Sequence, residues 1–349
     1  MIKTKVFKLK VFMENIIKAF MNPNFYDHEV EDVKIFQTHI SYVFLTGSYA
    51  YKIKKPVNFG FLDFSTLDKR KIFCEKELEL NRRLCGDMYI DVLPVTMSEG
   101  GIELNGRGEV VEYTLKMKEF PQERIMDNML ERDEVTKEHI DRIARIMSDF
   151  YINTQTSDEI NRYGSVDAIK FNWNENFEQT EEFMDKTIDR EKFQLIKNSV
   201  NNFMEEKRYL FEQRIRDGRI KDCHGDLHSR NIFIVNGIYI FDAIEFNERF
   251  RFSDTAADIA FFIMDLDFKN RKDLSEFFLN RYLEYSNDNE LLKLLDFYKC
   301  YRAYVRGKVL SFKLNDKYVD ENDKKESAHM AKKYFDLSHK YAKLLVPKS

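Results

Sequence analysis

The chain has 349 residues, of which 56 are basic and 60 acidic, so its formal charge is −4. Hydrophobic residues make up 43% of it and charged residues 33%, which excludes a disordered or collagen-like protein and predicts a globular one. The slightly acidic balance offers no basic surface to a polyanion, so we expect no nucleic-acid partner. A chain of this length favours two domains over one.

The four cysteines lie far apart and form no Cys-x-x-Cys pair, so neither a zinc site nor a disulfide framework is predicted. Residues 1–10 lack the apolar region of a signal peptide, and no apolar run approaches the length of a membrane-spanning helix. The sequence therefore predicts a cytoplasmic protein with reduced thiols and no membrane partner.

The first elements expected along the chain are strands and one helix. Residues 42–55 hold two β-prone runs around Gly47-Ser48, which predicts a hairpin with a two-residue turn. Residues 63–86 begin with possible N-caps and end at Gly86, as a helix does. Residues 100–120 indicate a further hairpin with Asn105-Gly106 in its turn.

A helical pattern begins at residue 136 and continues, with interruptions, through the rest of the chain. The change of pattern places a domain boundary near Lys118 to Gln122. One later segment departs from the helical pattern, the stretch CHGDLHSRNIFIVNGIYIFDAIEF from Cys223 to Phe246.

This stretch contains polar residues on both sides of a predicted hairpin. If Asn236-Gly237 forms a two-residue type I′ turn, Val235 pairs with Ile238, and Asn231 falls directly opposite Asp242. Directly opposed side chains project from the same face of a sheet at about 5 Å. The pattern thus predicts that an amide oxygen and a carboxylate meet at the open end of the hairpin.

Such a pair of oxygen ligands suits Mg²⁺, which gives Asn231 and Asp242 as candidate metal ligands. Asp226 precedes the hairpin and is the candidate to accept a proton from an attacking hydroxyl. A surface hairpin with polar ends is the alternative. Zinc binding by His224 and His228 is not supported, because Gly225 follows the first His where a metalloprotease motif has Glu.

The segments HGDLHSRN and FDAIEF resemble the protein-kinase catalytic loop and the metal-binding Asp that follows it. Because Gly follows the His and Asp-Phe-Gly is absent, the two segments resemble the aminoglycoside phosphotransferase family more than the eukaryotic kinases. Within that superfamily, the chain looks like an uncharacterised bacterial branch whose members are often fused to a P-loop ATPase. The resemblance implies an α+β, bilobal protein-kinase-like fold. Its small β-rich lobe with one long helix would span residues 25–119, after an N-terminal extension of residues 1–24, and its mostly helical lobe residues 120–349.

The resemblance also implies a lysine for the nucleotide phosphates and an apolar surface for adenine. Lys52 is the favoured lysine and Lys54, on the same strand face, is its rival. Val43 and Ala50 would cover the adenine ring, whose edge would bond to the backbone from Lys118 to Phe120. No Gly-rich loop precedes Val43, so a glycine-free turn around Thr38 to Ser41 would cover the phosphates.

Glu77 lies within the apolar stripe of the predicted 63–86 helix, so it requires a cationic partner, which Lys52 can supply. The alternative is a Glu at the edge of a loosely buried face. His228 and Arg230 follow Asp226 where kinases carry a cation beside the transferred phosphoryl group, although a structural salt bridge also explains Arg230.

Further charged residues are given structural or uncertain roles. Asp258 would brace the catalytic loop. Arg302 and Arg306, one helical turn apart, are best explained as a solvated basic face, and an anion-binding pair for the substrate is the alternative. An aminoglycoside acceptor would need acidic residues such as Glu245, Glu248, Asp265 and Asp267.

Taken as a member of that superfamily, the protein is expected to use ATP and Mg²⁺ to phosphorylate a hydroxyl of a small molecule. No G-x-x-x-x-G-K-[ST] motif occurs, so a P-loop ATPase would be a separate partner. A protein Ser/Thr kinase and a non-catalytic nucleotide-binding regulator are the alternatives, since the family defines no substrate.

Overall fold

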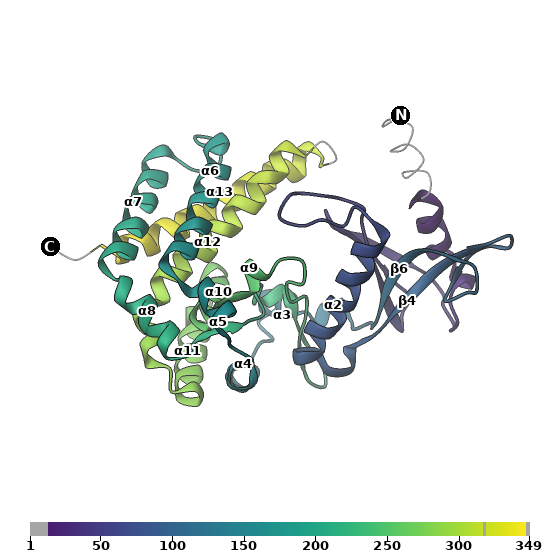
Figure 1. Ribbon diagram of the computed structural model, residues 1–349, viewed down its shortest axis with the longest axis horizontal. Coiled ribbons are helices and arrows are strands. Elements are labelled where there is room, and N and C mark those ends of the chain that lie inside the picture. The colour runs from purple at the N-terminus through teal and green to yellow at the C-terminus, as the bar shows by residue number, and fades with distance from the viewer. Residues whose placement is uncertain (1–12, 317–318, 347–349) are drawn as a thin grey trace. The chain divides into compact units, whose positions relative to one another are not determined.

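The computed structural model describes residues 13–316 and 319–346, which form two compact units. Unit 1 comprises the described residues up to Asn128 together with Ile232–Asn247. Unit 2 comprises Met129–Asn231 and the described residues from Glu248 onward. The expected α+β fold is confirmed, with strands concentrated in unit 1 and helices in unit 2 (Figure 1).

The sequence placed the domain boundary after residue 119, whereas unit 1 extends to Asn128 and also includes the later segment Ile232–Asn247. The reason is the hairpin of β8 (Ile232–Ile234) and β9 (Ile238–Ile240), which follows residues 223–231 of unit 2 but packs with unit 1. Phe233 joins the apolar cluster of the sheet, and Ile125 forms a bridge with Phe233.

Unit 1 is built on a six-stranded antiparallel sheet with strand order β1-β2-β3-β6-β4-β5. Its elements are β1 (Lys34–Gln37), β2 (Ser41–Leu45), β3 (Tyr49–Lys54), α2 (Leu67–Cys85), β4 (Tyr89–Ser98), β5 (Gly101–Leu104), β6 (Glu109–Lys118), β8 (Ile232–Ile234) and β9 (Ile238–Ile240), with short 3-10 turns at Pro23–Phe25, Gly86–Met88 and Gln122–Arg124.

The β2–β3 hairpin has the register expected from the sequence. Leu45 pairs with Ala50 and Val43 with Lys52, and the turn is Gly47-Ser48. Gly47 has φ +91°, which a type II′ turn requires at its first central position and which glycine adopts without strain.

The expected hairpin around Asn105-Gly106 is not formed. β5 and β6 both pair with β4, one on each side, so they are not neighbours. The tight turn of this region lies earlier, where Ser98 pairs with Gly101. The prediction failed because it overlooked β4, a long strand that follows α2 and separates the other two.

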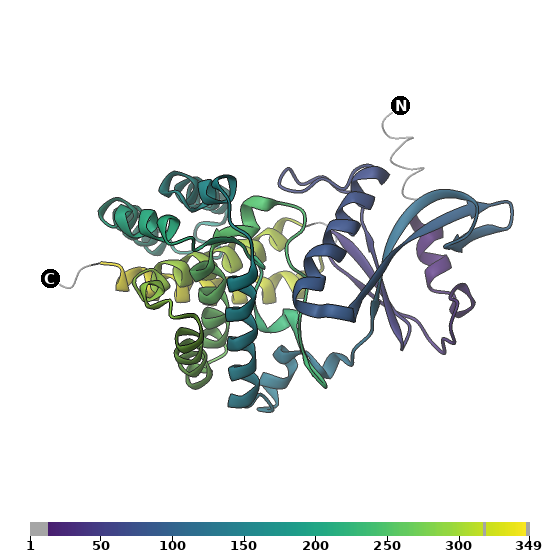
Figure 2. The ribbon, with the colours of Figure 1, turned by 60° about the horizontal axis from the view of Figure 1, so that its bottom comes forward.

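The sheet is covered on both faces. α2 packs over β4 and β6, whereas the helix that ends at residue 20 lies on the opposite face (Figures 1 and 2). Phe20 is fully buried against Phe44 and Tyr51. Residues 13–24, which the sequence assigned to an N-terminal extension, therefore contribute to the core of unit 1; residues 1–12 lie outside the described residues.

Unit 2 consists of helices around two short antiparallel strands. Its elements are α3 (Met126–Glu131, shared with unit 1), α4 (Lys137–Asn153), α5 (Asp158–Asn161), α6 (Val166–Thr180), α7 (Arg190–Glu206), α8 (Arg208–Arg216), β7 (Ile220–Asp222), α9 (Glu248–Arg251), β10 (Phe252–Asp254), α10 (Thr255–Phe268), α11 (Lys272–Ser286), α12 (Leu295–Phe312) and α13 (Glu321–Leu344), with 3-10 turns at Arg162–Gly164, Glu181–Phe183, Ser229–Asn231, Asn289–Lys293 and Lys313–Asn315.

α10 is the central helix of unit 2, because every residue from Thr255 to Leu266 is buried. A helix that is apolar on all sides needs neighbours on all sides, and α10 packs against both α11 and α12. Among the helices of the described residues, none has the length and hydropathy to cross a membrane.

Candidate active site

Strand β3 carries two lysines that share one buried carboxylate. Lys52 and Lys54 project from the face of the sheet that α2 covers. Lys52 Nζ lies 2.8 Å from Glu77 Oε1, and Lys54 Nζ lies 2.5 Å from Glu77 Oε2. Glu77 is fully buried on the inner face of α2. A buried carboxylate needs a cationic partner, and Lys52 and Lys54 compensate its charge.

Each lysine has a second carboxylate partner. Lys52 Nζ also lies 2.8 Å from Asp242 Oδ1, and Lys54 Nζ pairs with Glu245. Lys54 is 1% exposed and enclosed between Glu77 and Glu245, whereas Asp242 is 44% exposed at its side chain. Lys52 is therefore the lysine that extends toward an accessible carboxylate, and Lys54 is a core cation.

The network sets the charge states of its members. Burial by itself would lower the pKa of Lys52, but Asp242 and Glu77 raise that pKa well above its usual value. Burial would raise the pKa of Glu77, but Lys52 and Lys54 outweigh it and lower that pKa to about 2. Lys52 and Glu77 are thus a charged pair at neutral pH.

Asp242 reaches Lys52 by a route that differs from the expected one. The sequence placed Asn231 opposite Asp242 across a two-residue turn, but Ile234, not Val235, pairs with Ile238. Val235 N donates to Gly237 O at 3.0 Å, so the turn has three residues and the register is one residue out. A type I′ turn needs positive φ at both central residues, and neither Asn236 nor Gly237 adopts it.

Asp242 lies beyond the end of β9 with φ +64°. A non-glycine residue in this region is uncommon, and such residues gather at functional sites. The left-handed backbone, not strand pairing, directs the Asp242 carboxylate to Lys52. The hairpin is fixed to α2 nearby, because Ala243 N donates to Asn81 Oδ1 at 2.9 Å.

The residues assigned to adenine lie together on the same sheet face. Val43, Ala50 and Met117 belong to one apolar cluster with Phe233 of the hairpin. Phe120 also packs there, with its ring 5.5 Å from that of Phe233. The Lys118 side chain pairs with the exposed Asp87 and so does not belong to this cluster.

The glycine-free turn between β1 and β2 does not offer its amides to a phosphate. The N–H groups of Ile40 and Ser41 donate to Thr38 Oγ1 at 3.2 and 3.0 Å. A phosphate-binding loop needs such N–H groups to point outward.

In unit 2, Asp226 is held by two side chains of its own loop. Asn231 Nδ2 donates to Asp226 Oδ2 at 3.0 Å and to the Asp226 backbone oxygen at 3.0 Å. Because the amide nitrogen is used in this way, Oδ1 is the Asn231 atom that can coordinate a cation. His228 Nε2 lies 3.2 Å from Asp226 Oδ2.

His228 is held between the Asp226 carboxylate and the Arg230 backbone. Its Nδ1 accepts the Arg230 N–H at 3.2 Å, which leaves the proton on Nε2 to be donated to Asp226. His228 is 5% exposed, whereas Arg230 is exposed. Burial would raise the pKa of Asp226, but His228, Arg306 and His224 hold it well below its usual range.

The loop is braced from below by α10 and α12. Asp258 Oδ2 accepts the His224 N–H at 2.7 Å, and Asp258 Oδ1 accepts the Gly225 N–H at 3.0 Å. Arg302 Nη1 donates to Gly225 O at 2.8 Å and its Nη2 lies 3.4 Å from Asp258. Asp258 is thus the brace that the sequence indicated.

Arg302 does not belong to a solvated face, because it is 6% exposed and inserted under the loop. Of the four acidic residues proposed for a polycationic substrate, Glu248 is partly exposed, whereas the other three already have partners within the protein. Glu245 pairs with Lys54, Asp265 accepts the Ser229 N–H at 2.9 Å, and Asp267 pairs with Lys299 at 2.8 Å. The sequence signal for this burial was that Arg302 follows the apolar Tyr298 by four residues, one helical turn.

Taken unit by unit, the residues present suit Mg²⁺ and phosphate. In unit 1, Asp242 is an accessible oxygen donor fixed by its backbone, and Lys52 is a cation of the kind that phosphate oxygens bind. In unit 2, Asn231 is oriented by its amide bond to Asp226, which leaves its Oδ1 as a hard oxygen donor. Within residues 13–316 and 319–346, no group of three His, Cys, Asp or Glu residues suggests a different metal site.

Comparison with known proteins gives relatives and similar folds. No family model matches the chain. It is 33% identical over 286 residues to uncharacterized proteins of Mycobacterium bovis and Mycobacterium tuberculosis, an alignment that covers 81% of this chain and 56% of each relative. The chain thus spans little more than half the length of the curated relatives it matches.

Among solved structures, the chain is similar to kinases of small molecules. An ethanolamine kinase from Plasmodium vivax has 13% identity and a TM-score of 0.48 over 86% of this chain and 81% of that one. A choline kinase from Streptococcus pneumoniae has 17% identity and a TM-score of 0.46 over 93% and 99% of the two chains.

Proposed function

We propose that the protein is an ATP- and Mg²⁺-dependent phosphotransferase that moves the γ-phosphoryl group to a hydroxyl of a small molecule. The observation that carries the proposal is the position of Lys52, which bridges the buried Glu77 and the accessible Asp242. A lysine held in this way binds phosphate oxygens, and the carboxylate beside it binds the metal that accompanies them.

The second part of the proposal concerns Asp226. Its carboxylate is ionised at neutral pH and is aimed by His228 and Asn231, so it can accept a hydrogen bond from an acceptor hydroxyl. A carboxylate of such low pKa is a weak base in the ground state. It would orient the hydroxyl first and take the proton late, as the oxygen–phosphorus bond forms.

When bound, Mg²⁺ would neutralise charge on the phosphate oxygens. We assign Asp242 of unit 1 and Asn231 of unit 2 as its ligands, because Asn231 is joined directly to the hairpin that leads to Asp242. Val43 and Ala50 would pack on the adenine, whose edge would bond to backbone near Lys118 to Phe120. A separate P-loop ATPase partner stays a prediction of the sequence.

The proposal is tested by ATP consumption with a panel of hydroxylated metabolites and antibiotics. We expect turnover with at least one of them, and a loss of about 10²- to 10⁴-fold in Asp226→Asn. Nucleotide binding, measured by calorimetry, should persist in this variant. Asp273→Asn, which changes an exposed carboxylate in the same unit, is the matched control and should retain turnover.

Two results would contradict the proposal. Phosphate transfer to lysate protein with none to any small molecule would indicate a protein Ser/Thr kinase. Nucleotide binding without turnover in the native protein, unchanged in Asp226→Asn, would indicate a non-catalytic regulator.

A further inference from the structure

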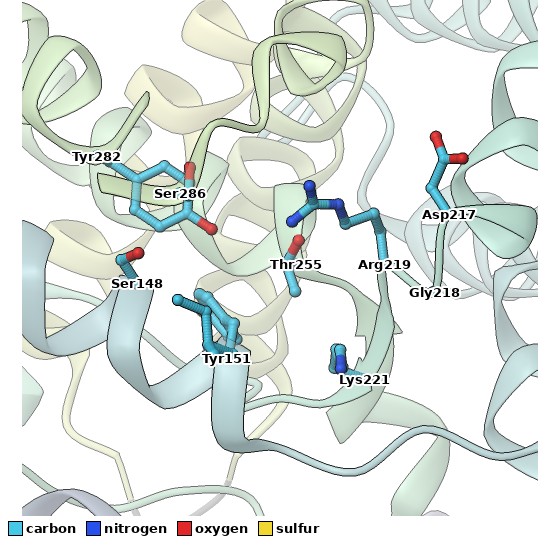
Figure 3. A pocket seen from close by; sticks show the side chains of 10 residues that line it. Ser148, Tyr151, Asp217, Gly218, Arg219, Lys221, Thr255, Tyr282 and Ser286 are labelled. Carbon is cyan, nitrogen blue, oxygen red and sulfur yellow. The ribbon is translucent and has the colours of Figure 1, made fainter. Parts of the chain in front are cut away.

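A cavity of about 150 Å³ lies in unit 2, lined by none of the residues from Cys223 to Asn231 (Figure 3). Its wall is formed by α4, the turn between α8 and β7, the start of α10 and the end of α11. The lining residues are Ser148, Tyr151, Ile152, Asp217, Gly218, Arg219, Lys221, Thr255, Tyr282 and Ser286. Most of them are polar, which distinguishes the cavity from a packing defect of the core.

Two cations enter this cavity from the same short segment. Arg219 and Lys221 are both partly buried, and the positive charge of Arg219 adds to burial in lowering the pKa of Lys221. Lys221 Nζ donates to the backbone oxygen of Thr154 at 2.9 Å, a contact that neutralises no charge. The two cations therefore create a positive potential in a partly desolvated space.

The carboxylates nearby compensate this potential only in part. Asp288 lies 3.9 Å from Arg219 Nε, but it is already paired with the buried Arg214. Asp217 is exposed at the rim and accepts the side-chain N–H of Gln213 at 2.7 Å. In Figure 3 the Arg219 guanidinium is directed toward the side of the cavity that holds Tyr282, with the Thr255 hydroxyl beneath it.

A buried hydroxyl faces the same cavity. Ser148 is 1% exposed, lines the cavity, and its Oγ has no hydrogen-bond partner among the described residues. A buried polar group without a partner costs about 1 to 3 kcal/mol, so it indicates a ligand that supplies the missing bond. Thr255, the first residue of α10, adds the positive end of a helix dipole.

We propose that this cavity is a binding site for a small oxyanion, either inorganic phosphate or the phosphate or carboxylate group of a small metabolite. Two cations and an unsatisfied hydroxyl are donors that such a group needs, and the α10 dipole adds to the positive potential. A cavity of this volume holds a molecule about the size of benzene, which suits phosphate and excludes a nucleotide. The site is independent of the proposed phosphotransferase activity.

The occupant would rest on elements that support the catalytic loop. Tyr151 lines the cavity, and its hydroxyl donates to Asp258 Oδ2 at 3.1 Å, the carboxylate that binds the His224 and Gly225 amides. Lys221 belongs to β7, the strand that leads directly into that loop. The proposed anion site therefore lies in unit 2 next to Tyr151, which contacts Asp258, and it does not include Asp226.

The test is a calorimetric titration of the full chain with inorganic phosphate at constant ionic strength. We expect saturable binding that is weakened at least about tenfold in Arg219→Ala and in Lys221→Gln, because each removes a charge-assisted bond. Ser148→Ala should weaken it less. Acetate in place of phosphate shows whether the site prefers a carboxylate, and saturable binding of either anion with this variant pattern supports the proposal.

Two controls separate this site from others. Arg216→Ala removes an exposed arginine of α8 that does not line the cavity, and it should bind phosphate as the native protein does. Lys52→Met removes the lysine proposed for nucleotide phosphates, and it too should leave this binding unchanged. The proposal is overturned if the native protein shows no saturable binding of either anion, or if Arg219→Ala, Lys221→Gln and Arg216→Ala bind alike. Melting temperatures establish which variants fold.

Discussion

Glu77 is a fully buried carboxylate whose two cationic partners have different surroundings. Lys54 is enclosed between Glu77 and Glu245, whereas Lys52 faces Asp242, whose side chain is 44% exposed. Losing Lys54 leaves two buried carboxylates short of a cation, and losing Lys52 leaves Glu77 still paired. The two lysines should therefore separate stability from activity.

We predict that Lys54→Met lowers the free energy of unfolding by about 3 to 5 kcal/mol, and Lys52→Met by only about 1 to 2 kcal/mol. Lys52→Met should instead reduce ATP turnover by about 10²-fold or more. Urea unfolding and turnover of both variants measure the two effects. Equal loss of stability in both, or unimpaired turnover in Lys52→Met, would contradict these roles.

Lys308 gives a prediction about pH. It is 8% exposed and donates at 2.7 Å to the side-chain oxygens of Asn176 and Gln179, and burial lowers its pKa to about 8. A lysine with a depressed pKa loses its proton in the folded state first, so the unfolded state binds more protons between about pH 8 and 10.5. The contribution of Lys308 to stability therefore rises with pH in this window.

Lys308→Met removes this dependence. From pH 8 to 10, the stability of the variant relative to the native protein should fall by about 2 kcal/mol. The constant cost of the lost hydrogen bonds cancels in that change, as do the other titrating groups. Urea unfolding at both pH values checks the slope, and a difference that stays constant would show that Lys308 has an ordinary pKa.

Residues whose environment is set by local sequence were predictable. Thr66 accepts the Lys69 N–H as an N-cap, and the position of Glu77 follows from helical periodicity. Partners that are distant along the chain were not predictable. Nothing in the sequence near Lys54 indicates Glu245, and nothing near Gly225 indicates Arg302, because these contacts depend on how separate elements pack.

At the scale of elements, α2 is attached to the sheet by buried ion pairs. Besides Glu77, its Arg70 Nε donates to both oxygens of Glu112 on β6 at 2.8 and 2.9 Å, and both residues are buried. Breaking one partner of such a pair leaves an uncompensated buried charge. Replacing both with apolar residues removes that penalty.

We therefore predict that Arg70→Met or Glu112→Met alone lowers the free energy of unfolding by about 3 to 5 kcal/mol, and that the double variant is more stable than either single one. Thr66→Ala, which removes only the N-cap of the same helix, should cost about 1 kcal/mol. Urea unfolding of the native protein, the two single variants and the double variant gives the coupling free energy of the pair. Additive losses in the double variant would mean that the pair is not coupled.

Two turns of unit 1 show that turn-forming residues alone do not predict the register of a hairpin. Gly47-Ser48 and Asn236-Gly237 both have turn chemistry, but only the first forms the expected two-residue turn. The first joins adjacent strands of a large sheet, whose pairing on both sides fixes the register. The β8–β9 hairpin is an isolated pair, and contacts outside it decide its register: Phe233 with the sheet and Cys85 Sγ with Ile240 O at 2.7 Å.

At the scale of the molecule, the five residues that the sequence proposed for phosphoryl transfer are divided between the two units. Lys52, Glu77 and Asp242 belong to unit 1, and Asp226 and Asn231 belong to unit 2. The sequence proposed them from the catalytic-loop resemblance and from the buried stripe of the helix that carries Glu77. It did not indicate that the hairpin between Asn231 and Asp242 packs with unit 1, because that depends on tertiary contacts that no local pattern expresses.

This division leads to a prediction for removal of the metal. Each unit is folded on its own contacts, and within the described residues no metal-binding cluster supports either core. Chelation by EDTA should therefore abolish ATP turnover without changing the melting temperature of the nucleotide-free protein. Mg²⁺ should restore turnover and, with a non-hydrolysable ATP analogue, raise the melting temperature, because a ligand that binds only the folded state stabilises it.

Asp242→Asn provides the matched variant for this experiment. It keeps the shape and the left-handed backbone, which Asn also tolerates, but removes the charge that attracts the cation. The variant should need at least about tenfold more Mg²⁺ for half-maximal turnover, whereas Asp87→Asn, at an exposed carboxylate of the same unit, should need no more than the native protein. A melting temperature that falls on chelation alone would make the metal structural. An unchanged Mg²⁺ requirement in Asp242→Asn would remove Asp242 from the metal site.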